Sequence, residues 1–375
     1  MSKETNYSLY YEPKSLRIEL EQKEDSTFRF NVTNSPNSNE DTLIKSIPEF
    51  LKNNVYIIDS VNSGSGREDL NLYTEIIKPL FSTLEIEYNY IQTKNADTIN
   101  EFASTFNTPN STIIFLSGDT SINEFVNNLK YKEHINIYPI PSGTGNSLAL
   151  SLGLTSQIQA VAHLLISEKI SPLFTYEVEL PSNSYYLVQD KPKDKINQPL
   201  KFLVVFSWAF HASLVADSDT QELRKHGLQR FQIAAKQNLE KEQKYEANLK
   251  INDEIVEGPF AYFVLTSAEK FEPTFEISPN GNILKDELYL IAFKTGIDIM
   301  EVMMQVYDKG SHIKNSNVIY KKIYKDDKLE LDILFSKDLI QRRFCLDGSI
   351  IALPETENHK IKIKTSSDTN LYIIH

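Results

Sequence analysis

Short apolar runs alternate with turns and helical patterns between residues 55 and 166. Each run is followed by a polar or glycine-bearing turn and then by apolar residues recurring every three or four positions. The runs are Val55–Ile58, Ile86–Ile91, Thr112–Leu116 and Ile135–Ile140, and helices are expected around residues 70–80, over Ala96–Phe106, from about Ser121 and up to about Ile166. This alternation is typical of a parallel sheet covered by helices on both faces. We therefore predict an α/β domain over residues 46–172.

After Pro172 the pattern changes, and expected strands outnumber expected helices. The strands are Phe174–Leu180, Phe202–Phe206, Ala247–Ile251, Ala261–Leu265, Leu288–Phe293, Val318–Ile323 and Leu329–Ile333; the helical patterns are Thr220–Lys241 and Asp298–Lys309. Polar turns separate these segments, as in antiparallel sheets. Residues 173–375 are therefore predicted to form a second, mainly antiparallel β domain, with a surface loop at Lys191–Gln198.

The first 45 residues carry a weaker pattern. Two short strands are expected at Ser15–Leu20 and Thr27–Val32, followed by a polar stretch, Asn34–Asp41, that has the composition of a flexible loop. We interpret residues 1–45 as an N-terminal extension of the α/β domain.

Composition excludes several classes of protein. Of the 375 residues, 41% are hydrophobic and 24% charged, which is ordinary globular usage and unlike collagen, coiled coils or wholly disordered chains. No apolar run reaches the ~18 residues that span a bilayer, and the N-terminus does not resemble a signal peptide. Cys345 is the only cysteine, which rules out a disulfide framework, and the histidines are too scattered for a zinc site. These features predict a cytoplasmic protein.

The formal net charge of −12 limits the partners. An acidic chain does not attract the phosphate backbone through its overall field, so we expect no nucleic-acid partner. The same sign argues against a protein held on anionic lipid by charge alone, while a local hydrophobic contact with membrane stays open.

Three of the predicted strands end in glycine-bearing turns. These are Asn62–Gly66 (NSGSG), Ser117–Asp119 (SGD) and Ser142–Asn146 (SGTGN). Ligands of parallel α/β sheets bind beyond the carboxyl ends of the strands, and glycine lets backbone N–H groups approach a phosphate. A single such turn could serve only to shape a tight connection. Three after strands of one sheet point to a nucleotide, although the P-loop motif and G-x-G-x-x-G are both absent.

The three segments together resemble the diacylglycerol kinase/sphingosine kinase lipid-kinase superfamily, whose motifs are N-P-x-x-G, [GS]-G-D-G-x-x-x-E and P-x-G-[ST]-G-N. The corresponding residues here are Asn62–Gly66, Ser117–Glu124 and Pro141–Asn146. Segments of the second domain are similar to sphingosine and ceramide kinases: Ser207–Phe210 (SWAF, where those proteins have S-W-G-F), Glu222–Phe231, Val306–His312 and Leu346–Gly348.

The resemblance implies a fold and an activity. The fold would be an α/β nucleotide-binding domain like that of NAD kinases and diacylglycerol kinases, followed by a β-sandwich that takes the lipid. The activity would be transfer of the γ-phosphate of ATP, with Mg²⁺, to a lipid hydroxyl at a transiently contacted membrane surface. A sphingoid base is the first acceptor expected, then ceramide, then diacylglycerol.

The resemblance also implies roles for particular residues. Asp119 is the candidate base, the alternative being an N-cap for the helix near Ser121. The positions matching nucleotide contacts are Asn62, Gly64, Ser117, Gly118, Thr120, Glu124, Ser142, Gly143, Thr144, Asn146, Arg224, Arg230 and Asp347. For Glu124 the alternative is a solvated helix charge, for the two arginines ordinary surface positions, and for Asp347 a turn before glycine. No metal ligand is assigned.

Asp217 matches the position that contacts the polar head of the lipid, where a carboxylate would suit an ammonium group. The alternative is a helix cap, with Asp219 as a close competitor for the role. Trp208 and His211 are interpreted as core or cleft lining.

The chain also departs from the family pattern. The proline of the first motif is missing, and that turn is one residue short. Thr120 replaces a glycine, Ser349 a glutamate of the D-G-E motif, and Gln221 a glutamate of the substrate segment. The sequence therefore allows a divergent active kinase or a pseudokinase that only binds lipid or nucleotide, while the second-domain segments argue against a soluble-substrate kinase such as an NAD kinase. It gives no oligomeric state.

Overall fold

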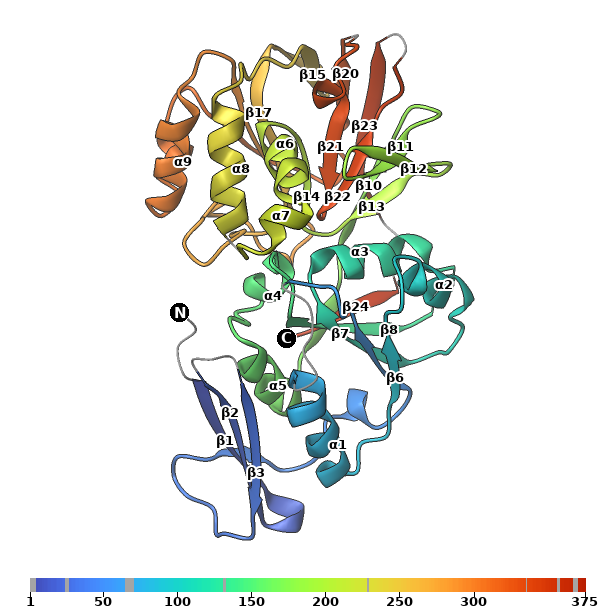
Figure 1. The fold of residues 1–375 in the computed structure, drawn as a ribbon, viewed down its shortest axis with the longest axis vertical. Helices are drawn as coiled ribbons and strands as arrows, with labels where there is room; N and C mark the ends of the chain where they lie inside the picture. Colours follow the sequence, from blue (N-terminus) through green and yellow to red (C-terminus); the bar gives the residue numbers. More distant parts are fainter. Residues whose placement is uncertain are drawn as a thin grey trace. The chain divides into compact units, whose positions relative to one another are not determined.

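The computed structural model describes residues 5–23, 27–64, 71–130, 133–227, 229–334, 336–355, 358–366 and 370–375. Gly66, in the first predicted turn, and Leu70, in the helical pattern after it, lie outside these ranges. The chain divides into two compact units (Figure 1). The first contains Met1–Leu173 and Asn370–His375, and the second contains Phe174–Thr369.

A six-stranded sheet forms the centre of the first unit. Its strand order is β6-β5-β7-β8-β24-β9. The strands are β5 (Val55–Asp59), β6 (Asn89–Gln92), β7 (Ser111–Ser117), β8 (Ile135–Pro141), β9 (Ile170–Pro172) and β24 (Leu371–Ile374). All neighbours pair in parallel except β24 and β9, which are antiparallel. The predicted parallel α/β domain is therefore confirmed.

Helices cover both faces of this sheet, which explains why its strands are continuous apolar runs. On one face α2 (Thr98–Thr105) and α3 (Asp119–Asn128) pack through aromatic rings. The ring centroids of Phe125 in α3 and Phe115 in β7 are 5.6 Å apart. The other face carries α1 (Lys78–Leu84) and α5 (Gln157–Ile166), which share a core with the neighbouring positions Ile114 and Leu116 (Figure 1). The π-helix η3 (Tyr73–Ile77) leads into α1, and the short α4 (Ser147–Ser151) follows β8.

The N-terminal residues form a second sheet of the first unit. Its order is β3-β2-β1-β4, with β1 (Thr5–Tyr11), β2 (Leu16–Gln22), β3 (Phe28–Thr33) and β4 (Thr42–Ile44). Leu9 and Ile18 are fully buried in the same core as Ile57 and the helices α1 and α5. The segment interpreted as an extension is thus an integral layer of the unit, because most of its large apolar side chains pack in or against that core.

The second unit is a sandwich of two antiparallel sheets, as predicted. The six-stranded sheet has the order β13-β10-β23-β20-β15-β16 and the eight-stranded sheet β12-β11-β22-β21-β14-β17-β18-β19. The first contains β10 (Thr175–Glu179), β13 (Leu200–Phe202), β15 (Ala247–Ile251), β16 (Glu254–Glu257), β20 (Leu329–Ile333) and β23 (His359–Ser366). The second contains β11 (Tyr185–Val188), β12 (Lys191–Lys195), β14 (Val205–Ala209), β17 (Phe260–Thr266), β18 (Leu288–Lys294), β19 (Ile319–Ile323), β21 (Arg343–Leu346) and β22 (Ser349–Ala352).

Both sheets contribute to one apolar core. Trp208 is fully buried there and stacks on Phe344 at 5.8 Å, and His211 is 9% exposed, so the interpretation of both residues as interior positions is confirmed. Burial lowers the pKa of His211 to about 4, and its Nδ1 lies 2.7 Å from the Ser207 hydroxyl. A neutral, hydrogen-bonded ring is therefore part of this interior.

The helices of the second unit differ from the sequence-based expectation. The predicted helix Thr220–Lys241 is two helices, α7 (Gln221–Arg224) and α8 (Gln229–Leu239), with Gly227 at φ +54° between them. An additional helix, α6 (Phe210–Ser218), has buried residues on most sides and therefore lacks the periodicity that would have predicted it. α9 (Ile299–Tyr307) agrees with the pattern at Asp298–Lys309.

Two strand predictions are also corrected. The expected strand Phe202–Phe206 divides into β13 and β14, which belong to different sheets, because the chain turns at Leu203 and Val204. The loop expected at Lys191–Gln198 contains β12, an edge strand whose side chains are exposed. Among the described residues, no helix is long and apolar enough to cross a membrane.

Candidate active site

Three glycine-bearing turns meet at the carboxyl edge of the parallel sheet. The first two follow β5 and β7, which are neighbours at the point where the strand order reverses, and the third follows β8. A Cβ atom on Gly143 would lie 2.5 Å from Gly118 Cα, and one on Gly118 would lie 2.8 Å from the Gly145 carbonyl oxygen. A Cβ on Gly64, at φ +66°, would lie 2.9 Å from the Ser142 carbonyl oxygen. The turns are in backbone contact, which only glycine allows at these positions.

Side chains within the third turn fix its shape. The Gly143 amide donates to Asn146 Oδ1 at 2.9 Å, and Asn146 Nδ2 donates to the Gly143 carbonyl at 2.6 Å. Gln157 Nε2 donates to the Ser142 hydroxyl at 2.8 Å, while Thr144 is half-buried. The side chains of Asn146 and Ser142 are therefore engaged within the protein, and so are the backbone amides of Gly143 and Ser142, the latter donating to the Ser117 carbonyl at 3.1 Å.

Asp119 links the second turn to the third. It is the first residue of α3, directly after the N-cap position at Gly118. Its carboxylate accepts the backbone amides of Ser147, at 2.7 Å, and Leu148, at 3.2 Å, which begin α4. Thr120 has a helical backbone, so the side chain that replaces the family glycine imposes no unusual angle.

The remaining first-unit candidates surround these turns. Ser117 donates its hydroxyl to the Gly118 carbonyl at 3.0 Å, and Glu124 is half-buried one turn into α3. Asn62 is exposed in the turn after β5. The structure thus brings the backbone of Gly64, Gly118 and Gly143 together and places the Asp119 carboxylate beside the second and third turns.

In the second unit, Arg224 and Arg230 converge on Asp219. Arg224 donates to both carboxylate oxygens, at 2.8 and 3.0 Å, and Arg230 Nη1 lies 3.1 Å from Oδ1. The hydrogen bond with Asp219 raises the pKa of Arg224, whereas burial, with Arg224 adding repulsion, lowers the pKa of Arg230. Two guanidinium groups held by one carboxylate form a cationic pair suited to an oxyanion.

Asp347 has a structural position. It is 2% exposed, and its carboxylate accepts the backbone amides of Leu203, Val204 and Val205 at 2.6, 2.9 and 2.7 Å. It therefore holds the chain where β13 passes into β14. The three backbone donors give Asp347 a structural role, and its assignment to the nucleotide stays a prediction.

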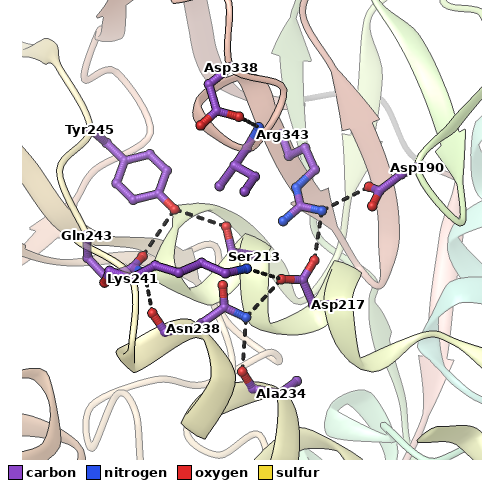
Figure 2. A network of polar contacts seen from close by, with 11 residues as sticks. Asp190, Ser213, Asp217, Ala234, Asn238, Lys241, Gln243, Tyr245, Asp338 and Arg343 are labelled. Carbon is purple, nitrogen blue, oxygen red and sulfur yellow. Dashed lines mark hydrogen bonds and ion pairs between the residues drawn. The ribbon is translucent and has the colours of Figure 1, made fainter. Parts of the chain in front are cut away.

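Asp217, expected to face the lipid head, belongs to a polar network that Figure 2 shows. Its Oδ1 lies 2.8 Å from Arg343 Nη1, and Asn238 Nδ2 donates to its Oδ2 at 2.9 Å. Lys241 Nζ lies 3.7 Å from the same carboxylate, and Asp190 pairs with Arg343 at 2.9 Å. The sequence analysis missed Arg343 and Asp190, because nothing local indicates that β21 and the β11–β12 turn meet Asp217.

Comparison with known proteins agrees with this arrangement. Residues 56–178 match the family model of the diacylglycerol kinase catalytic domain. Over 176 residues the chain is 26% identical to sphingosine kinase B of Dictyostelium discoideum, a match that covers 44% of this chain and 23% of that protein. The matched stretch is thus less than a quarter of that relative's length.

A solved structure, described as a diacylglycerol kinase of Bacillus anthracis str. Sterne, has a similar fold. The TM-score is 0.53 at 16% identity, over 87% of this chain and 97% of that one. This likeness concerns the fold alone and confirms the α/β domain followed by a β sandwich. The family match over residues 56–178 and the similarity to sphingosine kinase B support the resemblance to the diacylglycerol kinase and sphingosine kinase superfamily of lipid kinases.

Proposed function

We propose that the chain is an ATP-dependent kinase that phosphorylates a lipid hydroxyl. The observation that supports this most directly is the contact of three glycine turns at the carboxyl edge of the sheet, with the Asp119 carboxylate between two of them. Backbone amides in such turns bind phosphate, and phosphoryl transfer depends mainly on positioned phosphates and neutralised charge.

In this proposal each group has a distinct task. The turns at Gly64, Gly118 and Gly143 hold the ATP phosphates through backbone N–H groups. The oxygen of the acceptor hydroxyl forms a bond to the γ-phosphorus, and Asp119 accepts the proton of that hydroxyl. The bond between the γ-phosphorus and the oxygen that joins it to the β-phosphate breaks, which releases ADP. Arg224 and Arg230 neutralise the negative charge of a phosphate group, and this group competes with Asp219 for the two guanidinium groups.

Magnesium is the expected counterion of the nucleotide. Among the residues described, no group of three or more metal-ligating side chains is present. Such a group is not required, because Mg²⁺ with a nucleotide usually takes one or two carboxylates and phosphate oxygens. Asp119 and Glu124 are the carboxylates that α3 offers, and the ion would supply charge neutralisation at the phosphates.

The acceptor is a lipid with a free hydroxyl. The second-unit segments favour the primary hydroxyl of a sphingoid base, with ceramide and diacylglycerol as the alternatives. Such substrates reside in bilayers, so the proposal includes transient, peripheral contact of a cytoplasmic protein with membrane. Sedimentation with lipid vesicles, compared with and without acceptor lipid, tests that contact.

A second function, a pseudokinase that binds without transferring phosphate, is favoured by one observation. The Asp119 carboxylate accepts hydrogen bonds from two backbone amides, and this structural role would explain the presence of an aspartate here without catalysis. The assay described next distinguishes the two functions.

The test is transfer of radiolabelled γ-phosphate from ATP, with Mg²⁺, to sphingosine, dihydrosphingosine, ceramide and diacylglycerol. We expect one or more acceptors to be labelled, and Asp119→Asn to reduce the rate by about 10²–10⁴, the usual effect of a general base. Asp253→Asn, at an exposed turn, is the matched control and should leave the rate unchanged. ATP binding and thermal melting of Asp119→Asn separate lost catalysis from lost structure.

Each other outcome has a definite meaning. ATP or lipid binding without product from any acceptor supports the pseudokinase. Product that persists in Asp119→Asn refutes the assignment of the base but not the kinase.

A further inference from the structure

Arg343 is a buried cation beside the carboxylate expected to meet the acceptor's head group. Its side chain is 2% exposed, at the start of β21, and Nη1 lies 2.8 Å from Asp217 and 2.9 Å from Asp190. Burial lowers the pKa of Arg343, but the ion pairs with Asp217 and Asp190 outweigh it and raise the pKa above its ordinary value. The guanidinium is therefore charged at any physiological pH.

This pairing changes what Asp217 can bind. Its side chain is 19% exposed, and its oxygens receive Arg343, Asn238 and, more distantly, Lys241. An ammonium group of a lipid would have to displace a guanidinium that has no exit to water. It would also approach a second buried positive charge, which in a medium of low dielectric is strongly unfavourable. The internal cation thus occupies the position expected for a cationic head group.

The same guanidinium has unused donors. Among the described residues, Arg343 Nε and Nη2 are buried without a hydrogen-bond partner, and so is Asn238 Oδ1. In Figure 2 the guanidinium of Arg343, the hydroxyls of Ser213 and Tyr245 and the amide of Asn238 face a common region. Ser213 and Tyr245 are 3.0 Å apart, and Arg343 contributes to lowering the pKa of Tyr245, which burial raises overall.

Buried unpaired donors indicate what this region would accept. Each unsatisfied group costs ~1–3 kcal/mol, so native proteins rarely keep them without a ligand or water. N–H donors require an oxygen acceptor, and an acyl carbonyl supplies one without positive charge. Ceramide and diacylglycerol both carry such a carbonyl near the hydroxyl to be phosphorylated, whereas a sphingoid base carries an ammonium there.

We propose that Arg343 determines the acceptor class, selecting lipids with an uncharged head group and an acyl carbonyl over sphingoid bases. The guanidinium donates to that carbonyl through Nη2 or Nε and excludes an ammonium group from Asp217. This proposal rests on the proposed kinase function and reverses the order of acceptors that the sequence favours. Arg343 acts on binding and orientation and does not take part in the transfer of the phosphoryl group.

The first measurement is kcat/KM for ceramide, diacylglycerol and sphingosine in mixed micelles. We expect ceramide or diacylglycerol to exceed sphingosine by at least about tenfold, the effect of ~1.4 kcal/mol. The two neutral lipids appear as separate arms, so the assay also identifies which acyl linkage is preferred. A wild-type preference for sphingosine overturns the proposal.

Variants then assign the preference to Arg343. Arg343→Met frees Asp217 and should lower the neutral-to-sphingosine ratio at least about tenfold, mainly through KM. Lys360→Met is the control, since Lys360 is a 49% exposed cation that pairs with Glu330 outside this network, and it should leave the ratio unchanged. An unchanged ratio in a folded Arg343→Met protein refutes the proposal.

Loss of the arginine alone leaves Asp217 unpaired in the interior and can unfold the protein. Arg343→Met combined with Asp217→Asn removes both charges, so this double variant should also lose the preference for neutral lipids. Binding of fluorescent ceramide, diacylglycerol and sphingosine to wild type and double variant requires no turnover. If the double variant still binds neutral lipids in preference to sphingosine, the proposal is overturned. If the double variant loses this preference but the wild type phosphorylates no lipid, only the kinase function is refuted.

Discussion

Ala209 lies at the junction of β14 and α6 in a conformation that L residues rarely adopt, with φ +62° and ψ −137°. It is the third residue of SWAF, where the resembling kinases have glycine. Such a backbone costs ~1–3 kcal/mol for a residue with a Cβ. The chain therefore keeps a sharp turn into α6 at the expense of local strain, close to the polar residues that α6 carries.

Replacement of Ala209 by glycine should stabilise the protein. At the middle of its range, about 2 kcal/mol, the released strain exceeds the summed cost of losing the buried methyl group, ~0.8 kcal/mol, and of the added freedom of the unfolded chain, ~0.4–1 kcal/mol. We expect the free energy of unfolding in urea to rise by roughly 0.5–1 kcal/mol on this balance. Ala292→Gly, at a fully buried position of β18 in regular register with β19, is the control and should destabilise by about 1 kcal/mol. Equal destabilisation by both substitutions would contradict this account.

The glycine turns act at the scale of whole elements, because each connects a strand to the helix after it while contacting another turn. Gly143 and Gly145 belong to the same turn but differ in their surroundings. A Cβ on Gly143 meets the Gly118 backbone at 2.5 and 2.8 Å, whereas a Cβ on Gly145 meets nothing within 4 Å. Substituting each of these two glycines in turn therefore distinguishes the effect of close packing between the turns from the effect of backbone flexibility at a glycine.

Gly143→Ala should force the second and third turns apart. We expect a loss of ~1–3 kcal/mol in stability, as for other overpacked sites, and weaker ATP binding, because the turn amides lose their alignment. Gly145→Ala should change stability by less than about 0.5 kcal/mol, as substitutions in open space do. Urea unfolding and ATP titration of the two variants provide the measurement. Equal effects would mean that contact between the turns is not important.

At the scale of the whole molecule, the last strand of the chain returns to the first unit. β24 lies between β8 and β9 in the first sheet, after the chain has completed the second unit. Ile373 is fully buried there, whereas Ile170 on the adjacent strand β9 is 40% exposed. The stability of the first unit therefore depends on residues that the sequence assigns to the second domain.

Ile373→Ala should destabilise the first unit by ~2–5 kcal/mol, since it leaves a cavity in a sheet interior. Ile170→Ala, the same chemical change at an exposed position of the paired strand, should cost less than about 1 kcal/mol. Thermal unfolding followed by circular dichroism compares them. A similar decrease in both variants would show that β24 is only loosely attached.

Much of the fold was predictable from the local pattern of apolar and polar residues, and the wrong predictions have physical reasons. β5, β7 and β8 are buried on both faces and therefore appear as unbroken apolar runs. α6 was missed because burial on most sides removes helical periodicity, and the layer β1–β4 was underestimated because few of its residues are apolar. Of the candidate site, the glycine turns do lie in contact with one another, whereas the backbone amides that Asp347 accepts could not be foreseen, because they belong to residues about 140 positions away in the chain.

The sequence by itself determined the α/β alternation, the glycine turns and the family resemblance, because these depend on residue types at short spacing. Tertiary structure alone decided that β24 completes the first sheet, that Asp119 caps α4 and that Arg343 neutralises Asp217. These contacts join residues far apart in the chain, and hydrogen bonds and ion pairs leave no periodic trace in a sequence. The acceptor preference that we propose depends on the last of them.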